Sequence, residues 1–172
     1  MSTLAARPIS TERLDLLPLR VEHAEEMAVV LSDPGLHTFT GGAPDTPQAL
    51  RSRYERLTAG SAVPSVSWLN WVLHLRAESR LTGTVQATVG PSDDGLTAEI
   101  AWVVGTPWQG RGIAREAARG LLSWLRERSV HTVIAHIPPD HRASAAVATA
   151  AGLTPTDARH DGERRWQRPL GR

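Results

Sequence analysis

The sequence predicts a mixed α/β domain from two observations: extended and helical segments alternate along the chain, and one central helical segment carries a long apolar stripe. The size of the chain adds a third observation. Its 172 residues are 41% hydrophobic, which is enough to bury a core without metal or disulfide support. We therefore expect residues 1–172 to form one domain.

Six segments have the alternating or continuously apolar pattern of β-strands and are bounded by turn residues. They are residues 12–19, 71–76, 82–89, 97–104, 130–137 and 164–168. Pro18 marks the end of the first strand or a place at the sheet edge, because proline cannot donate to a strand ladder. Turns are expected near Glu78-Ser79-Arg80 and over residues 91–95.

Four segments have the spacing of helices. They are residues 21–32, 46–57, 114–125 and 142–151. Asp33-Pro34-Gly35 should end the first helix, and Thr46 followed by Pro47 suits the N-cap and first position of the second. In the third, six apolar residues fall on one face: Ala114, Ala117, Ala118, Leu121, Leu122 and Leu125. Gly152 suits the C-terminal end of the fourth.

Composition excludes several classes of protein. A net charge of +1 argues against a nucleic-acid binder or a membrane-surface protein, and no apolar run approaches the roughly 18 residues of a membrane span. With no cysteine, the chain has no disulfide, thiolate nucleophile or Cys-ligated zinc. The spacing of His131, His136 and His141 suits no metal site, so none is expected. A cytoplasmic domain, monomeric or homodimeric, remains as the expectation.

The most informative segment is a glycine-rich turn between the strand that ends at Val104 and the third helix. The first amides of a helix have no internal partners and face an approaching anion, and Gly110 and Gly112 let a phosphate reach them. Arg115 excludes the dinucleotide fingerprint, and the absence of lysine excludes a P-loop. By itself this pattern leaves two possibilities open, a pyrophosphate site and an ordinary turn.

The segment Gln109–Ala114 resembles the Q/R-x-x-G-x-G/A signature of the GNAT N-acetyltransferase superfamily. Three further segments resemble its RimJ/RimL-like branch: Thr11–Leu14, His141–Ser144 and Ala151–Leu153. The resemblance covers nearly the whole chain in the right order. It implies a mixed, mostly antiparallel sheet of six to seven strands flanked by about four helices.

The resemblance also implies a site for acetyl-CoA. The amides of the glycine turn would hold its pyrophosphate, the end of the preceding strand would pair with its pantetheine arm, and an amide of Val103 or Val104 would polarise the thioester. Ser144 would contact the cofactor, with His141 standing where the family has Asn. The implied cofactor-binding residues are Trp102, Val103, Val104, Gln109, Gly110, Arg111, Gly112, Ile113, Ala114, Arg115, His141 and Ser144.

The expected reaction is direct attack of a primary amine on the thioester, since no cysteine or nucleophile-elbow serine offers a covalent route. Glu99 is the candidate general base, acting through water; a purely structural role stays open, as do the histidines at 37, 74 and 136 as alternative bases. Several relatives have a tyrosine where this chain has Ala148, and Tyr54 lies elsewhere, so no tyrosine acid is expected.

The acceptor pocket is expected to form from the loop Leu36–Gly42, the second helix and the strand that begins at Trp71, with His37, Phe39 and Trp71 lining it. The acceptor is a protein N-terminus, by the branch resemblance, or a small-molecule amine. Two other functions remain open. The chain could be a non-catalytic acyl-CoA-binding sensor, or it could use another donor such as succinyl-CoA.

Overall fold

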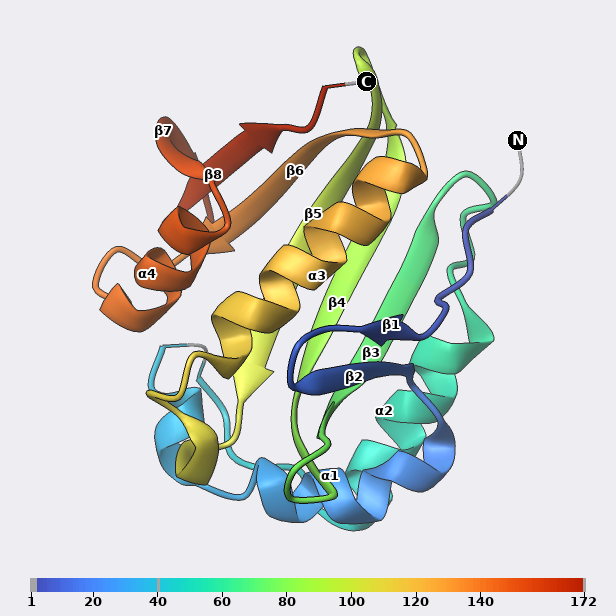
Figure 1. Cartoon of the computed structure of the whole chain (residues 1–172), viewed down its shortest axis with the longest axis vertical. Coiled ribbons are helices and arrows are strands. Elements are labelled where there is room, and N and C mark those ends of the chain that lie inside the picture. The colour runs from blue at the N-terminus through green and yellow to red at the C-terminus, as the bar shows by residue number, and fades with distance from the viewer. Residues whose placement is uncertain (1–2, 40, 172) are drawn as a thin grey trace.

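The computed structural model describes residues 3–39 and 41–171, which form one eight-stranded sheet in the order β1-β2-β3-β4-β5-β6-β8-β7 (Figure 1). The strands are β1 (Ile9–Ser10), β2 (Leu14–Pro18), β3 (Ser67–Leu75), β4 (Arg80–Ser92), β5 (Gly95–Val104), β6 (Val130–Ile137), β7 (Thr154–His160) and β8 (Glu163–Pro169). Every neighbouring pair is antiparallel except β5 and β6. The mixed, mostly antiparallel sheet is confirmed, with more strands than the six to seven expected.

Helices cover both faces of the sheet. Within the described residues, the α-helices are α1 (Ala24–Val30), α2 (Pro47–Ala59), α3 (Ile113–Glu127) and α4 (Arg142–Ala150). Short 3-10 turns precede three of them, at η1 (Val21–His23), η2 (Pro34–His37) and η3 (Thr106–Trp108). None of the helices in the described ranges combines the length and apolarity needed to cross a membrane.

The local signals for the second and third helices are confirmed. The Thr46 hydroxyl accepts a hydrogen bond from the Ala49 amide at 3.1 Å, so Thr46 is the N-cap of α2 and Pro47 is its first residue. The expected stripe of α3 is buried, apart from a partly buried Ala114, and Trp124 joins it. Burial of that stripe against the sheet, more than helix propensity, keeps α3 in place.

The structure corrects several boundaries. Two strands were not predicted: β1 has two residues, and β7 is an almost wholly exposed edge strand containing Pro155, so neither shows an alternating pattern. The first helix was expected over residues 21–32, but a 3-10 turn occupies its start and α1 ends at Val30. β3 begins at Ser67, four residues before the predicted start.

The two faces of the sheet differ in how far they are covered. α3 lies along one face (Figure 1), where Trp71 of β3 meets Trp124 of α3 edge-on, with ring centroids 5.2 Å apart. Val72 points to the other face and is also fully buried, and α1 and α2 contact β4 and β3. Farther along the sheet that second face is exposed at Gln86, Thr88, Glu99 and Ala101, which we call the open face.

Candidate active site

The turn that leads into α3 exposes the first amides of the helix. Gly110 and Gly112 have φ angles of +75° and +79°, a left-handed conformation that side chains disfavour. A Cβ at Gly110 would meet no heavy atom within 4 Å, so this side of the turn is open. Gly112 is the N-cap of α3, and no described side chain hydrogen-bonds to the first turn as a cap. The geometry therefore presents uncapped amides, with the positive end of the helix dipole behind them.

Three side-chain hydrogen bonds, to the end of β5 and to the β3–β4 turn, hold this turn. The Gln109 side-chain amide donates to the Val104 carbonyl at 3.0 Å, which ties the turn back to β5. The Arg111 guanidinium pairs with Glu78 at 2.6 Å, and the Trp108 indole donates to the same carboxylate at 3.0 Å. The hydrogen bonds from Arg111 and Trp108 lower the pKa of Glu78. The side chain of Arg111 is thus engaged with the β3–β4 turn and does not point to a ligand at the start of α3.

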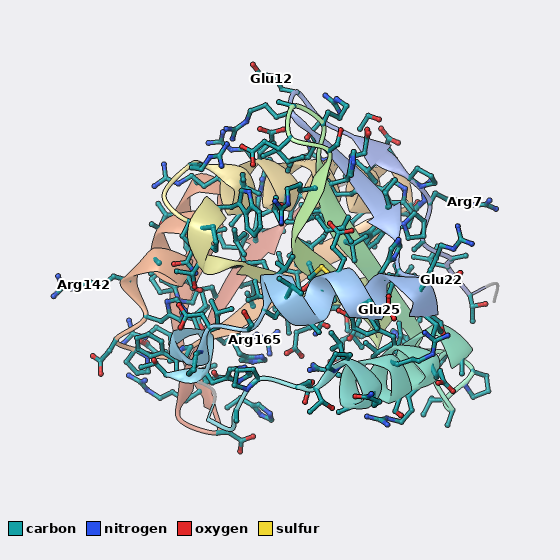
Figure 2. All side chains as sticks on the ribbon, turned by 90° about the horizontal axis from the view of Figure 1, so that it is seen from below. Arg7, Glu12, Glu22, Glu25, Arg142 and Arg165 are labelled. Carbon is teal, nitrogen blue, oxygen red and sulfur yellow. The ribbon has the colours of Figure 1, made fainter. Side chains whose placement is uncertain are left out.

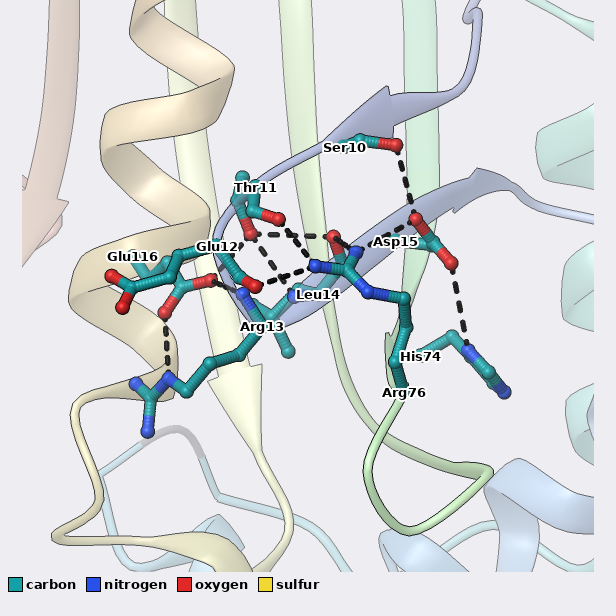
Figure 3. Close-up of polar contacts among 9 residues, drawn as sticks. All are labelled: Ser10, Thr11, Glu12, Arg13, Leu14, Asp15, His74, Arg76 and Glu116. Carbon is teal, nitrogen blue, oxygen red and sulfur yellow. Dashed lines mark hydrogen bonds and ion pairs between the residues drawn. The ribbon is translucent and has the colours of Figure 1, made fainter.

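The loop between β1 and β2 anchors the first turn of α3 from the other side (Figure 3). Glu116 accepts hydrogen bonds from the Thr11 hydroxyl, from the Arg13 amide at 2.7 Å and from the Arg13 Nε at 2.8 Å. Arg13 Nη1 also donates to the Arg111 carbonyl at 2.9 Å. Burial raises the pKa of Glu116, but these hydrogen bonds and the Arg13 charge outweigh burial and leave that pKa lowered. Thr11 and Arg13, from one of the segments that carry the resemblance, therefore hold the first turn of α3 in place.

β5 and β6 separate at the middle of the sheet. Their parallel pairing runs only from Leu96 to Glu99, whereas β4 stays paired with β5 as far as Val104. Beyond Glu99 the edge of β5 that faces β6 therefore has no strand partner among the described residues. Trp102, Val103 and Val104 form this unpaired edge, which an extended ligand can join as an added strand.

On the other edge of residues 102–104, which faces β4, Gly83 determines how closely the two strands approach. A Cβ at Gly83 of β4 would lie 2.2 Å from the Val103 carbonyl oxygen, closer than any side chain allows. Gly83 therefore lets β4 approach β5 closely at the point where β6 has already separated. The position of Val103 depends on this contact.

Glu99 and His136 meet where the two strands separate. Glu99 Oε2 lies 3.1 Å from His136 Nδ1, and the side chains are 52% and 12% exposed. The His136 ring also lies 5.1 Å from the ring of His160 on β7. From the sequence, Glu99 and His136 were alternative candidates for the general base. The structure brings them together as a hydrogen-bonded pair on the open face.

The start of α4 carries the two other cofactor candidates. His141 is the N-cap: its Nδ1 accepts from the Ser144 amide at 3.2 Å, and its Nε2 lies 3.3 Å from the Ser144 hydroxyl. Phe39 stacks on the same imidazole, with ring centroids 4.3 Å apart and an interplanar angle of 24°. The loop between α1 and α2 thus reaches across to α4, although its residue Thr40 lies outside the described part of the chain.

The remaining predicted residues are not brought together. Trp71 does not line a pocket: its side chain is fully buried, and its Nε1 donates to the Arg7 carbonyl at 2.8 Å, so this prediction was wrong. His74 lies 3.9 Å from Asp15 on the neighbouring strand, apart from the Glu99–His136 pair. His37 ends η2 and is half-buried. The described residues contain no cluster of three or more histidines and acids suited to a metal ion.

The His141 cap predicts a pH dependence. Burial lowers the pKa of His141, so its neutral form stabilises the fold fully above about pH 6.5, the ordinary value, and that contribution is lost as the pH falls through the folded pKa. His141→Asn keeps a capping acceptor that does not titrate. We expect the melting temperature of the wild type to fall more than that of the variant between about pH 7.5 and about pH 5.5. Thermal unfolding followed by circular dichroism measures the difference; parallel curves would contradict the assignment.

Several solved structures share this fold. A GNAT-family acetyltransferase from Bacillus anthracis is 20% identical, with a TM-score of 0.76 over 95% of this chain and 99% of that one. RimL, a ribosomal-protein α-N-acetyltransferase in complex with coenzyme A, is 15% identical, with a TM-score of 0.76 over 95% and 98%. The microcin self-immunity acetyltransferase MccE, in complex with acetyl-CoA and AMP, is 17% identical, with a TM-score of 0.74 over 92% and 93%.

No curated protein matches the sequence. The family model described as "Acetyltransferase (GNAT) domain", in contrast, matches residues 13–154. That range runs from the Arg13 anchor through the glycine turn to the start of β7. The chain belongs to the GNAT acetyltransferase family.

Proposed function

We propose that this protein transfers the acetyl group of acetyl-CoA to a primary amine by direct attack in a ternary complex. One observation carries the proposal: the uncapped N-terminus of α3 follows β5, and the edge of β5 that faces β6 has no strand partner beyond Glu99 among the described residues. The amides from Gly110 to Arg115 suit the pyrophosphate, and the edge from Trp102 to Val104 suits the pantetheine arm. The complexes of RimL with coenzyme A and of MccE with acetyl-CoA support this choice of donor.

The backbone of β5 can supply the electrostatic stabilisation. As the amine nitrogen attacks the thioester carbon, the carbonyl oxygen becomes negative and the bond to sulfur breaks. An amide of Val103 or Val104 can donate to that oxygen, because Gly83 and the β4 ladder hold this segment rigidly. The thiolate that leaves has an ordinary pKa of about 8.5 and takes its proton from water, so no dedicated acid is needed.

Glu99 and His136 are placed to remove the proton from the amine. When Nδ1 of His136 donates to Glu99 Oε2, Nε2 holds the lone pair that can accept a proton. The carboxylate then stabilises the imidazolium that forms. We assign His136 as the base and Glu99 as the group that positions it, in place of Glu99 acting through water. An α-amine, with a pKa of about 7.7 to 8, needs little help to lose its proton near neutral pH.

Ser144 and His141 border the path of the cofactor at the start of α4. The His141 ring is covered on one face by Phe39 and bonded at both nitrogens to Ser144, so it is held in one orientation. We propose that this unit closes one side of the cofactor channel and that Phe39 and His37 contribute to the acceptor side. Two acceptor classes are compatible with this arrangement: a protein N-terminus, which the branch resemblance implies, and a small-molecule amine.

The function is tested with acetyl-CoA and a panel of amines that includes short peptides with free N-termini, amino acids and alkyl amines. We expect release of coenzyme A and a mass increase of one acetyl group on at least one acceptor class. Tight binding of acetyl-CoA with no release across the panel would instead favour an acyl-CoA-binding sensor. A competition with succinyl-CoA in the same assay identifies the preferred donor.

The pair of Glu99 and His136 is tested by single substitutions. His136→Asn should lower kcat by about 10²-fold, since a positioned base contributes at least that much. Glu99→Gln should lower kcat by about tenfold, and neither change should alter the affinity for acetyl-CoA. His131→Asn is the matched control, because His131 lies on the same strand and its side chain hydrogen-bonds to the neighbouring Thr132 and not to Glu99. An unchanged kcat in His136→Asn would rule out the assignment of the base.

The pyrophosphate site is tested at Arg115, an exposed residue in the first turn of α3. Arg115→Glu suits the helix dipole but places a negative charge beside the phosphates. We expect coenzyme A binding, measured by calorimetry, to weaken by at least about tenfold, or about 1.4 kcal/mol, with no loss of thermal stability. Arg51→Glu, at an exposed position of α2, makes the same change of net charge, and this variant should bind coenzyme A normally. Equal weakening in both variants would show only a general effect of net charge.

A further inference from the structure

We infer that the acceptor carries an anionic group, a carboxylate or a phosphate, a few bonds from its amine, and that Arg165 binds this group. The inference rests on the proposed function and narrows its acceptor. It favours a small zwitterionic amine, such as a free amino acid, over a peptide N-terminus, whose neighbouring carbonyl is an uncharged amide.

The position of Arg165 places it beside the reacting groups. Arg165 of β8 is the register partner of His136 of β6. Directly opposed residues of an antiparallel pair point to the same face, with Cβ atoms about 4.5–5.5 Å apart. Arg165 therefore lies on the same face as His136 and its partner Glu99, one strand farther from β5.

The side chain of Arg165 is half-buried on the face that it shares with His136. Seen from below, Arg165 lies between the ribbons, inside the outline of the molecule, whereas Arg7 and Arg142 extend outward at its margin (Figure 2). Its Nε is buried and has no hydrogen-bond partner among the described residues. The acidic residue two places earlier on the same strand, Glu163, forms no ion pair with it within 4.0 Å. A buried guanidinium donor without a partner is uncommon in a native protein. It indicates that a ligand supplies the hydrogen-bond acceptor at this position.

The charges around Glu99 and His136 indicate which chemical groups such a ligand carries. Glu99 supplies a carboxylate on the β5 side, and Arg165 supplies a fixed cation on the β8 side. The guanidinium fork matches the two oxygens of a carboxylate or phosphate, which a single ammonium cannot do. A ligand that places its amine at His136 and its anion at Arg165 spans only one strand spacing, so its two groups are separated by few bonds.

The test measures binding in the presence of saturating coenzyme A, where no turnover occurs. The probes are alanine, leucine, phenylalanine and arginine with their α-amides, and phosphoethanolamine with ethanolamine. The amide in each pair keeps the amine but mimics a peptide. We expect each preferred acid to bind at least about tenfold more tightly than its amide. Phosphoethanolamine separates a phosphate preference from a carboxylate preference.

Substitutions test whether Arg165 causes the tighter binding of acids than of their amides. Arg165→Gln should abolish the advantage of acid over amide, and Arg165→Lys should restore only part of it, because lysine keeps the charge without the fork. Arg164→Gln, on the adjacent residue that points to the opposite face, is the matched control and should keep the advantage. Thermal unfolding of each variant verifies that it is folded.

The outcomes separate this inference from the proposed function. Equal binding of acids and amides, absence of binding by every acid, or an equal loss in the Arg164 and Arg165 variants would overturn the anionic subsite. If acids bind through Arg165 but no amine of any class releases coenzyme A, the subsite stands and the transferase proposal fails. If amides and peptides are acetylated as well as acids, the transferase stands and the subsite fails.

Discussion

The separation of β5 from β6 after Glu99 is the constraint on which the rest of the structure depends. A parallel pair needs a helical crossover, and here α3 supplies it between Val104 and Val130. Because the pairing ends early, the second half of β5 keeps one edge without a strand partner in the described part of the chain, and α3, whose first amides are uncapped, follows after the η3 turn. A ligand with an extended arm and a diphosphate can satisfy both sets of backbone groups at once.

An uncapped helix end binds an anion well only if neighbouring contacts fix its position. Three segments hold it: the Gln109 side chain from within the turn, Glu78 from the β3–β4 turn through Arg111, and Arg13 with Thr11 through Glu116. These contacts use side chains for support and leave the main-chain amides of the turn toward the ligand. The arrangement reduces the reorganisation that binding a doubly charged diphosphate would otherwise require.

The uneven cover of the sheet leaves one part of its second face accessible. α3 spans one face, while α1 and α2 cover the other face only near β3 and β4. The same face carries Glu99 on β5, His136 on the next strand, β6, and Arg165 on the strand after that, β8. Phe39 reaches this side from the α1–α2 loop and stacks on His141. Polar side chains are therefore concentrated in the uncovered part of the sheet, next to the unpaired edge of β5.

Local patterns were sufficient where a single segment determines its own structure. The cap at Thr46, the apolar stripe of α3 and the glycine turn before that helix depend on residues close in sequence, so the sequence alone predicted them. The mixed sheet and the family followed from the same kind of signal. The edge strand β7 was not predicted, because an exposed strand has no alternation of apolar and polar residues.

Only the tertiary structure decided which distant residues meet. Glu99 and His136 are 37 positions apart, and the parallel register of β5 and β6 brings them within 3.1 Å. A tryptophan in a strand suits a pocket or a core equally well, and only the packing of Trp71 against α3 settles that it is core. The burial of the Arg165 Nε likewise results from strand order. Such contacts depend on register and on which face a strand presents, and neither is encoded within one segment.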